Sequence, residues 1–226
     1  MTTLLIKICG LRTPDALDAA LDAGADMVGF VFFPPSPRNI GVQAARVLGE
    51  RVQGRAKKVA LSVDATDAEL ALAVEALKPD LLQLHGKETP ERVVAVRSRF
   101  HLPVMKAIPI ETRADLSSVR LYAGVADRLL FDARAPREAT RPGGLGKSFD
   151  WHLLENLNLS VPFTLSGGLD ADNVAEALRI TRAPSVDVSS GVERAPGEKD
   201  PDKISAFVRT ARAAEKALAQ SLAGAP

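Results

Sequence analysis

The chain of 226 residues is 46% apolar and 25% charged, carries a formal net charge of +1 and contains one cysteine, Cys9. This length and composition predict one large α/β domain over residues 1–226 rather than two small domains. The near-zero net charge argues against nucleic acid and anionic membrane surfaces as main partners, and one cysteine excludes a disulfide framework or a cysteine-based metal site. Residues 1–8 do not form a signal peptide and no apolar run has the length of a membrane span, so we expect a cytoplasmic protein.

Short apolar segments alternate with amphipathic segments along the whole chain. The apolar segments are mostly apolar on both faces and predict buried parallel strands at residues 4–9, 27–32, 57–63, 81–84, 104–107, 128–132, 163–166 and 185–189. The amphipathic segments predict helices at residues 16–23, 42–52, 68–77, 91–99, 113–122, 149–156, 171–180 and 203–222. Several of these helices follow a capping residue, a proline and an acid, as in Thr13-Pro14-Asp15.

This alternation predicts a (β/α)₈ TIM barrel, in which a parallel eight-stranded barrel is surrounded by outer helices. A doubly wound open sheet is the alternative, but no Gly-x-Gly-x-x-Gly sequence follows the first strand. In a TIM barrel the functional residues lie at the carboxyl ends of the strands and on the loops that follow them. We therefore expect the site among the polar residues at these strand ends.

Two glycine-containing loops follow the last two predicted strands. The first contains Gly167 and Gly168, and the second contains Ser189, Ser190 and Gly191. Glycine lets the backbone approach a ligand closely, and its amides can donate to phosphate oxygens. TIM-barrel enzymes often bind phosphate between these two loops. A pair of tight turns is the structural alternative, but two such loops in succession favour a phosphate-binding site.

Cys9 ends the first predicted strand, and Lys7 points from the same face of that strand because strand side chains alternate. A nearby ammonium favours the thiolate, so we expect Lys7 to lower the pKa of Cys9 and to let the thiolate act as a general base. The alternative is that Cys9 is a small buried apolar residue.

Asp132 closes the otherwise apolar strand at residues 128–132. Partial burial would raise its pKa and allow it to donate a proton near neutral pH. A helix cap or an ion pair with Arg134 is the equally weighted alternative.

Further polar residues mark the ends of other strands. Arg38 lies in a proline-rich loop that could aim its guanidinium at a carboxylate through two hydrogen bonds. Asp187 shares a strand face with Ser189 and could hold a ligand hydroxyl, or it could be a structural carboxylate. His85 has no partnering metal motif, so we assign it, with Lys7, Arg38 and Asp187, to substrate binding and predict no metal.

A series of motifs occurs in order along nearly the whole chain. These are Lys7-Ile8-Cys9-Gly10, Gly29-Phe30-Val31-Phe32, Ser36-Pro37-Arg38, Gln83-Leu84-His85-Gly86, Gly143-Gly144 with Phe149-Asp150-Trp151, Ser166-Gly167-Gly168-Leu169 and Asp187-Val188-Ser189-Ser190-Gly191-Val192-Glu193. In combination they resemble the phosphoribosylanthranilate isomerase family of tryptophan biosynthesis. One departure is Leu145, since the family usually has threonine in the run Gly143-Gly144-Leu145-Gly146.

The resemblance implies a (β/α)₈ fold and an Amadori rearrangement of an aminoaldose phosphate to an aminoketose phosphate. By similarity, Cys9 is the general base, Asp132 is the general acid and Arg38 binds the anthranilate carboxylate. The loops with Gly168 and with residues 189–191 bind the phosphate. This chemistry needs no cofactor, and the expected partner is a small-molecule substrate bound by a monomer or homodimer.

Other functions remain compatible with a phosphate-binding barrel. An indole-glycerol-phosphate synthase-like enzyme or a sugar-phosphate epimerase would share the phosphate loops, but the synthase would place lysine and glutamate at several strand ends. A non-catalytic barrel that binds a phosphorylated metabolite is the third possibility. The glycine- and proline-rich segment 134–148 is a candidate lid over the site.

Overall fold

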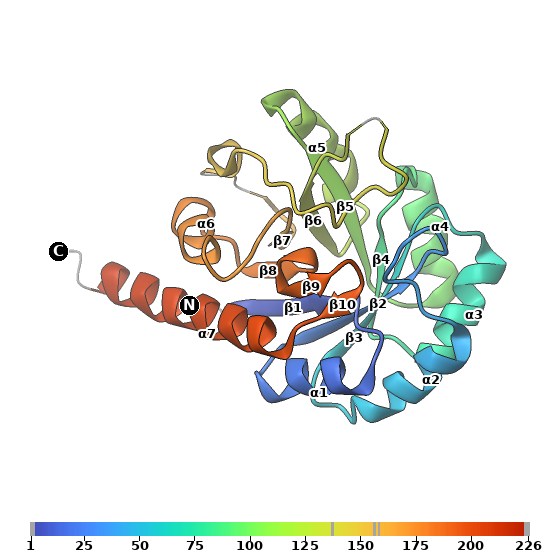
Figure 1. Ribbon diagram of the computed structural model, residues 1–226. Coiled ribbons are helices and arrows are strands. Elements are labelled where there is room, and N and C mark those ends of the chain that lie inside the picture. Colours follow the sequence, from blue (N-terminus) through green and yellow to red (C-terminus); the bar gives the residue numbers. More distant parts are fainter. Residues whose placement is uncertain (1–2, 137, 156, 158, 224–226) are drawn as a thin grey trace.

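The computed structural model describes residues 3–136, 138–155, 157 and 159–223, and its centre is a closed parallel barrel (Figure 1). The barrel strands are β1 (Leu5–Cys9), β2 (Met27–Phe32), β3 (Lys57–Ser62), β4 (Leu81–Leu84), β5 (Val104–Ile110), β6 (Arg128–Ala133), β7 (Phe163–Leu165) and β8 (Ser185–Val188). Each strand pairs in parallel with the next, and β8 pairs with β1 to close the ring. The predicted barrel is thereby confirmed, and the open-sheet alternative is wrong.

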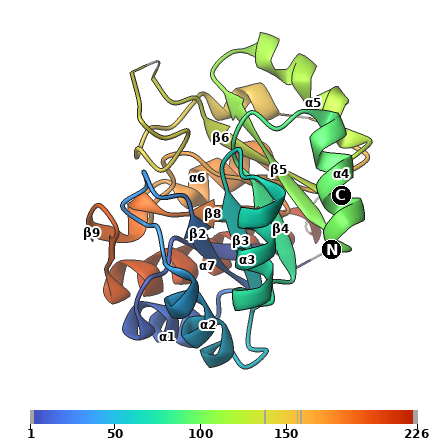
Figure 2. The same cartoon turned by 90° about the vertical axis from the view of Figure 1, so that its right-hand side faces the viewer.

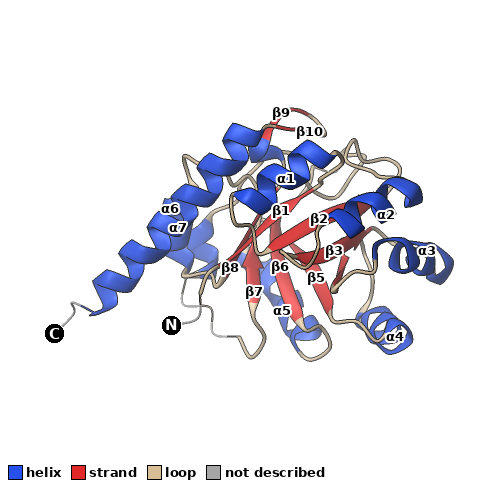
Figure 3. Cartoon of the chain, turned by 90° about the horizontal axis from the view of Figure 1, so that it is seen from below, coloured by secondary structure: helices blue, strands red, loops and turns tan. Residues whose placement is uncertain are grey.

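Helices surround the strands on the outside of the barrel (Figure 3). They are α1 (Pro14–Asp22), α2 (Val42–Arg51), α3 (Asp67–Leu77), α4 (Pro90–Phe100), α5 (Leu116–Ala123), α6 (Val174–Thr181) and α7 (Pro201–Ala223). Three 3₁₀ helices are η1 (Arg113–Asp115), η2 (Trp151–Leu154) and η3 (Ser190–Val192). The predicted caps form as expected, since Thr13 and Thr89 each accept a backbone hydrogen bond at the start of α1 and α4.

The helix predicted at residues 149–156 is wrong. Only η2 forms there, and Asn156 lies outside the described residues. Asp150 caps this short turn, whereas Glu155 at its end has an extended backbone. Asparagine at positions 156 and 158 and Pro162 beyond them are poor helix formers, which limits the helix to one turn.

A second feature absent from the sequence prediction follows β8. There the chain forms a small antiparallel hairpin of β9 (Glu193–Ala195) and β10 (Glu198–Lys199) before α7 begins. The long helix α7 packs against α1 and α6, and its last turns extend past the barrel in Figure 1. No helix among the described residues combines the length and the apolar composition needed to cross a membrane.

The interior of the barrel is layered, and the layers define where a ligand can bind. An apolar cluster that includes Met27, Val59, Met105 and Leu130 fills the amino-terminal end. Above it lie the buried polar side chains of Lys7, Gln83 and Asp187. A second, smaller apolar cluster of Cys9, Val31 and Leu61, with Phe33 and Val63 against it, lies nearer the carboxyl ends of the strands. The filled floor leaves only the carboxyl-terminal end open to a substrate.

Candidate active site

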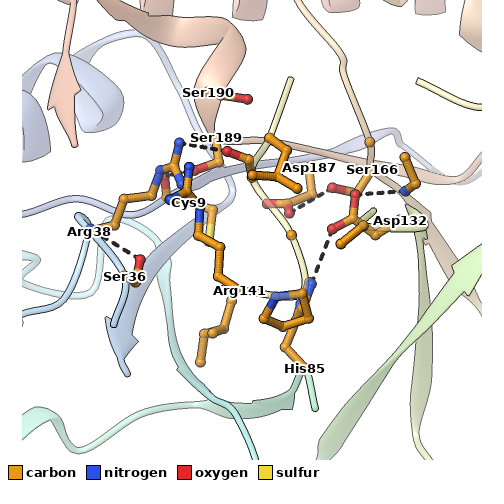
Figure 4. Close-up of a pocket in the computed structure, with 18 of the residues that line it drawn as sticks. Cys9, Ser36, Arg38, His85, Asp132, Arg141, Ser166, Asp187, Ser189 and Ser190 are labelled. Atoms are coloured by element: carbon orange, nitrogen blue, oxygen red, sulfur yellow. Dashed lines mark hydrogen bonds and ion pairs between the residues drawn. The ribbon is translucent and has the colours of Figure 1, made fainter. Parts of the chain in front are cut away.

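Residues from widely separated parts of the sequence line one cavity at the carboxyl ends of the strands (Figure 4). The predicted site residues that line it are Cys9, Arg38, His85, Asp132, Gly167, Gly168, Asp187, Ser189 and Ser190. Lys7 and Gly191 do not line it; the Lys7 side chain is fully buried, and Gly191 is partly exposed. The cavity is also lined by residues 134–135, 141–145 and 147 of the segment 134–148, of which residue 137 lies outside the described residues.

The thiol of Cys9 belongs to a buried polar network inside the barrel. Lys7 Nζ, two residues earlier on β1, donates to Asp187 Oδ1 at 2.8 Å, and Ser166 Oγ donates to Asp187 Oδ2 at 3.2 Å. On β2, Gly29 makes room for this group, because a Cβ there would lie 3.0 Å from both Cys9 Sγ and Lys7 Nζ. Strand alternation therefore places the ammonium and the thiol together, as the sequence predicted.

The direction of the Cys9 pKa shift beside Lys7 differs from the prediction. Burial raises the pKa of the Cys9 thiol, and the neighbouring Lys7 ammonium lowers it only in part. The expected net lowering is wrong because the thiol is fully enclosed by the barrel, where an ion loses its hydration. For Lys7, burial acts against the charge, but the Asp187 carboxylate outweighs it and raises the pKa of Lys7 to about 12. Lys7 is therefore an ammonium and Cys9 a thiol at neutral pH.

On the other side of the cavity, Asp132 at the end of β6 is hydrogen-bonded to His85, which follows β4. His85 Nε2 lies 3.1 Å from Asp132 Oδ2, and His85 Nδ1 lies 2.9 Å from Nε2 of the fully buried Gln83. The other oxygen of Asp132 accepts from the amide of Ala133 at 2.9 Å. In Figure 4 the Asp132 carboxyl group points toward His85.

The segment after β6 covers this pair with backbone. A Cβ on Gly143 would lie 2.5 Å from Asp132 Oδ2 and 2.7 Å from His85 Nε2, so only glycine fits there. The same segment reaches the loop after β2, because Arg38 Nη2 donates to the carbonyl of Gly144 at 3.1 Å. Figure 2 shows these two loops, yellow and blue, on the same side of the molecule.

Arg38 is held by a carboxylate that the sequence analysis did not identify. Its Nε and Nη2 donate to the two oxygens of Glu193 at 2.7 and 2.8 Å, and Lys199 Nζ donates to Glu193 Oε1 at 2.8 Å. Burial opposes the charge on Glu193, but Arg38 and Lys199 together hold the pKa of this carboxyl group below its usual range. The hairpin β9–β10 supplies both Glu193 and Lys199, which places it directly behind Arg38.

The two glycine loops approach each other at the edge of the cavity. Gly167 and Gly168 adopt positive φ values of +88° and +65°, which side chains other than glycine rarely adopt. A Cβ on Gly191 would lie 2.0 Å from the carbonyl oxygen of Leu169, so the loop after β8 is pressed against the loop after β7. Ser190 begins η3, and its side chain is drawn at the cavity rim in Figure 4.

Arg141 is another cavity residue that the sequence analysis did not identify. It lies in the segment after β6, and Figure 4 shows its side chain extended within the cavity. Its Nε is buried and meets no hydrogen-bond partner among the described residues. No motif marks this arginine. Gln83, in contrast, is part of a quoted motif but was given no role, although it is a polar residue two positions before His85 on an apolar strand.

The described residues contain no group of three or more His, Cys, Asp or Glu side chains placed to hold a metal ion. The barrel and its cavity define the class of (β/α)₈-barrel enzymes with a site at the carboxyl ends of the strands. Comparison with known proteins identifies the family within this class. A sequence model of N-(5′-phosphoribosyl)anthranilate (PRA) isomerase matches residues 6–210, so the chain belongs to the PRA isomerase family.

Individual relatives agree with this assignment. The N-(5′-phosphoribosyl)anthranilate isomerase of Bradyrhizobium sp. (strain ORS 278) is 65% identical over 218 residues, which cover 96% of this chain and 100% of that protein. Phosphoribosyl anthranilate isomerase from Thermotoga maritima superposes with a TM-score of 0.85 at 32% identity, over 93% of this chain and 100% of that chain. A phosphoribosyl anthranilate isomerase in complex with reduced 1-(o-carboxyphenylamino)-1-deoxyribulose 5-phosphate gives 0.80 at 29% identity, with the same coverage. The predicted family is confirmed.

Proposed function

We propose that this chain catalyses the Amadori rearrangement of N-(5′-phosphoribosyl)anthranilate to the corresponding aminodeoxyribulose phosphate in tryptophan biosynthesis, with Cys9 as the general base and Asp132 as the general acid. The observation that carries the proposal is that both groups line one cavity, together with the two glycine loops and Arg38. The whole chain, residues 1–226, acts as one domain in the cytoplasm, and the reaction uses no metal and no cofactor.

The reaction begins with proton transfer from Asp132 to the furanose ring oxygen. The bond between that oxygen and C1 breaks, and the nitrogen lone pair forms an iminium with C1. Cys9 then removes the proton from C2, and the C–H electrons neutralise the iminium to give an enolamine. The enolamine becomes the aminoketose when C1 gains a proton and the C2 hydroxyl loses one, so the sequence is proton-neutral overall. Positioned acids and bases of this kind each contribute roughly 10²–10⁴ in rate.

Burial raises the pKa of Cys9, so the thiol must release its proton to water before it can act as the base. The resulting thiolate accepts the proton from C2 and returns to the thiol. The iminium brings a positive charge to the cavity and makes C2–H acidic, and both effects favour transfer of a proton away from carbon. The Lys7 ammonium, which stays charged beside Asp187, stabilises the thiolate before it accepts that proton.

The substrate is oriented by its two anionic groups. The apolar cluster of Val31 and Leu61, with Phe33 against it, offers a surface for the aromatic ring near Arg38. Arg38 binds the carboxylate, because its Nη1 is left over from the contacts with Glu193 and Gly144.

The remaining predicted residues bind the ribosyl phosphate. The backbone amides of Gly167, Gly168 and Gly191 and the hydroxyls of Ser189 and Ser190 bind the phosphate oxygens. Asp187 and His85 contact the sugar hydroxyls at the cavity floor, whereas the fully buried Lys7 acts on the substrate through Asp187.

The test is turnover of N-(5′-phosphoribosyl)anthranilate by the purified chain, followed by fluorescence. We expect turnover by the wild type, and a loss of at least about 100-fold for Cys9→Ala and for Asp132→Asn. The exposed Asp172→Asn serves as the matched control and stays at the wild-type rate. Near-normal activity of Cys9→Ala and Asp132→Asn would refute the assigned roles, and an inactive, folded wild type would refute the reaction.

The oligomeric state belongs to the same proposal. We expect a monomer or a homodimer, because the relative from Thermotoga maritima is described as a dimeric enzyme from which monomers have been generated. Analytical ultracentrifugation of the purified chain distinguishes the two states, and a larger assembly would contradict both.

A further inference from the structure

Gln83 has no role in the reaction described above, although it is buried in the centre of the barrel beside the residues that have one. Its side chain is 0% exposed, and its Nε2 lies 2.9 Å from His85 Nδ1. His85 Nε2 in turn lies 3.1 Å from Asp132 Oδ2. The Oε1 atom of Gln83 is buried and meets no hydrogen-bond partner among the described residues. The three side chains form one chain of hydrogen bonds that ends in an unused amide oxygen.

The observed orientation of the amide fixes the protons along this chain. An amide nitrogen can only donate, so His85 Nδ1 must accept and carries no proton. The neutral imidazole then has its proton on Nε2, which donates to Asp132 Oδ2. In this arrangement Asp132 is a carboxylate that accepts from His85 and from the amide of Ala133.

A half-turn of the Gln83 amide reverses every bond in the chain. Oxygen and nitrogen exchange places with almost no change in shape, so Oε1 faces His85 Nδ1 and accepts its proton. His85 Nε2 then has a lone pair, which only a protonated Asp132 can satisfy. Each arrangement leaves one amide atom of Gln83 without a partner, the oxygen in the first and the nitrogen in the second. The buried amide is therefore compatible with Asp132 as a carboxylate and as an acid.

We propose that Gln83 is a positioning residue that sets the tautomer of His85 and thereby allows Asp132 to be held in either protonation state. The inference rests on the proposed role of Asp132 as the general acid. When the site becomes competent, Asp132 takes up one proton from water, and His85 exchanges its ring proton with water without a net gain. The side chains of His85 and Asp132 are each 10% exposed, so water reaches this bond.

Other charged or titratable groups line the cavity or lie behind it, but they do not replace this chain of hydrogen bonds. The carboxyl group accepts no hydrogen bond from any of their side chains within the described residues. These groups are Lys7 and Cys9 on β1, Arg38 after β2, Arg134, Arg141 and Lys147 after β6, and Asp187 on β8. Among the described titratable side chains, His85 is therefore the one that is hydrogen-bonded to Asp132.

The tautomer can be read without any turnover. The chain has three histidines, and ¹⁵N NMR distinguishes a protonated Nδ1 from a protonated Nε2, with His85→Gln to assign the signals. In the substrate-free wild type we expect the proton of His85 on Nε2 while Asp132 is a carboxylate and on Nδ1 while Asp132 is protonated. In Gln83→Met, which keeps the volume but loses the amide, we expect both tautomers at every pH. One unchanged tautomer in the wild type from pH 4 to 8, or a doubly protonated ring in that range, would overturn the proposal.

Kinetics supply the second readout. We expect Gln83→Met to lower kcat by about 5- to 10-fold, which is the effect of losing one neutral hydrogen bond. The acidic limb of the profile of kcat against pH should move, and KM should change less than about twofold. Thr164→Val is the matched control, because Thr164 is equally buried and its hydroxyl also has no partner among the described residues. A Gln83→Met profile that coincides with the Thr164→Val profile would refute the role of Gln83. An inactive wild type with the expected NMR switch would instead refute the isomerase function and leave the tautomer switch standing.

Discussion

The ion pair between Lys7 and Asp187 at the centre of the barrel allows a quantitative test of what burial costs there. Lys7 Nζ lies 2.8 Å from Asp187 Oδ1, and the two side chains are 0% and 5% exposed. Replacing Lys7 by methionine leaves a carboxylate inside the barrel without its cation. Breaking a buried pair in this way costs about 3–5 kcal/mol. We therefore expect Lys7→Met to lower the free energy of unfolding by that amount at pH 7.

The double variant Lys7→Met/Asp187→Leu separates the loss of the pair from the isolated charge. With both groups apolar and of similar volume, no ion remains to be desolvated, and such replacements are often close to neutral. The double variant should therefore be more stable than Lys7→Met alone, by more than about 1 kcal/mol. It should also be inactive, because the cavity loses Asp187 and the ammonium beside Cys9.

The pH dependence gives a second magnitude for Lys7. Its pKa rises from 10.5 to about 12 in the folded chain, and this difference corresponds to about 2 kcal/mol. Because the pKa is raised on folding, the contribution is fully present below about pH 10.5 and is lost as the pH passes about 12. The stability gap between wild type and Lys7→Met should accordingly be smaller at pH 11 than at pH 9 in denaturant unfolding. A gap below about 1 kcal/mol at pH 7, or one that is constant up to pH 11, would refute the reasoning.

Three shorter predictions concern the cavity itself. Because burial raises the pKa of Cys9, kcat/KM should increase with pH above neutrality; a profile that is flat from pH 7 upward would contradict this. Gly143→Ala should lower kcat more than about tenfold, because the added Cβ would collide with Asp132. Gly124→Ala, where a Cβ would meet no atom within 4 Å, is the control and should be active. Equal kinetics of the two variants would contradict the close approach of Gly143 to Asp132. Arg141→Gln should raise KM about tenfold without lowering the melting temperature, because Arg141 Nε has no hydrogen-bond partner among the described residues that the variant would lose. An unchanged KM would show that the guanidinium does not bind substrate.

Much of the fold was predictable because the relevant signals are local. Buried parallel strands are short apolar runs, and each is separated from the next by an amphipathic helix, so the strand order follows from chain order. Alternation within a strand also puts Lys7 and Cys9 on one face, since they are two residues apart. The position of Asp132 at a strand end then locates it at the same end of the barrel as Cys9.

The features that the sequence did not reveal depend on contacts between distant segments. Glu193 follows β8 in a loop predicted only for phosphate binding, and nothing local indicates that it holds Arg38, 155 positions earlier. The direction of the Cys9 pKa shift also depends on distant contacts. Burial of the thiol by the barrel raises the pKa, the charge of Lys7 lowers it, and the sequence does not reveal which effect is larger. The prediction of a helix at residues 149–156 was wrong for a different reason: the amphipathic pattern favours a helix, whereas Asn156 at its end has a poor helix propensity.

The hairpin β9–β10 fixes the orientation of the buried Arg38 side chain, which supports its proposed role in substrate binding. Glu193 takes the edge formed by Nε and Nη2, which fixes the guanidinium plane and leaves Nη1 toward Gly144 and the cavity. Lys199 donates to Glu193 and to the carbonyl of Ser189, so it ties the same group to the phosphate loop. Two cations and one carboxylate leave this cluster with one excess positive charge. In the proposed function one substrate carboxylate neutralises that charge, and a substrate without it would leave the cluster unbalanced in a buried site. The charge of the cluster therefore supports the proposal that an anionic group binds at this end of the cavity and the phosphate at the glycine loops.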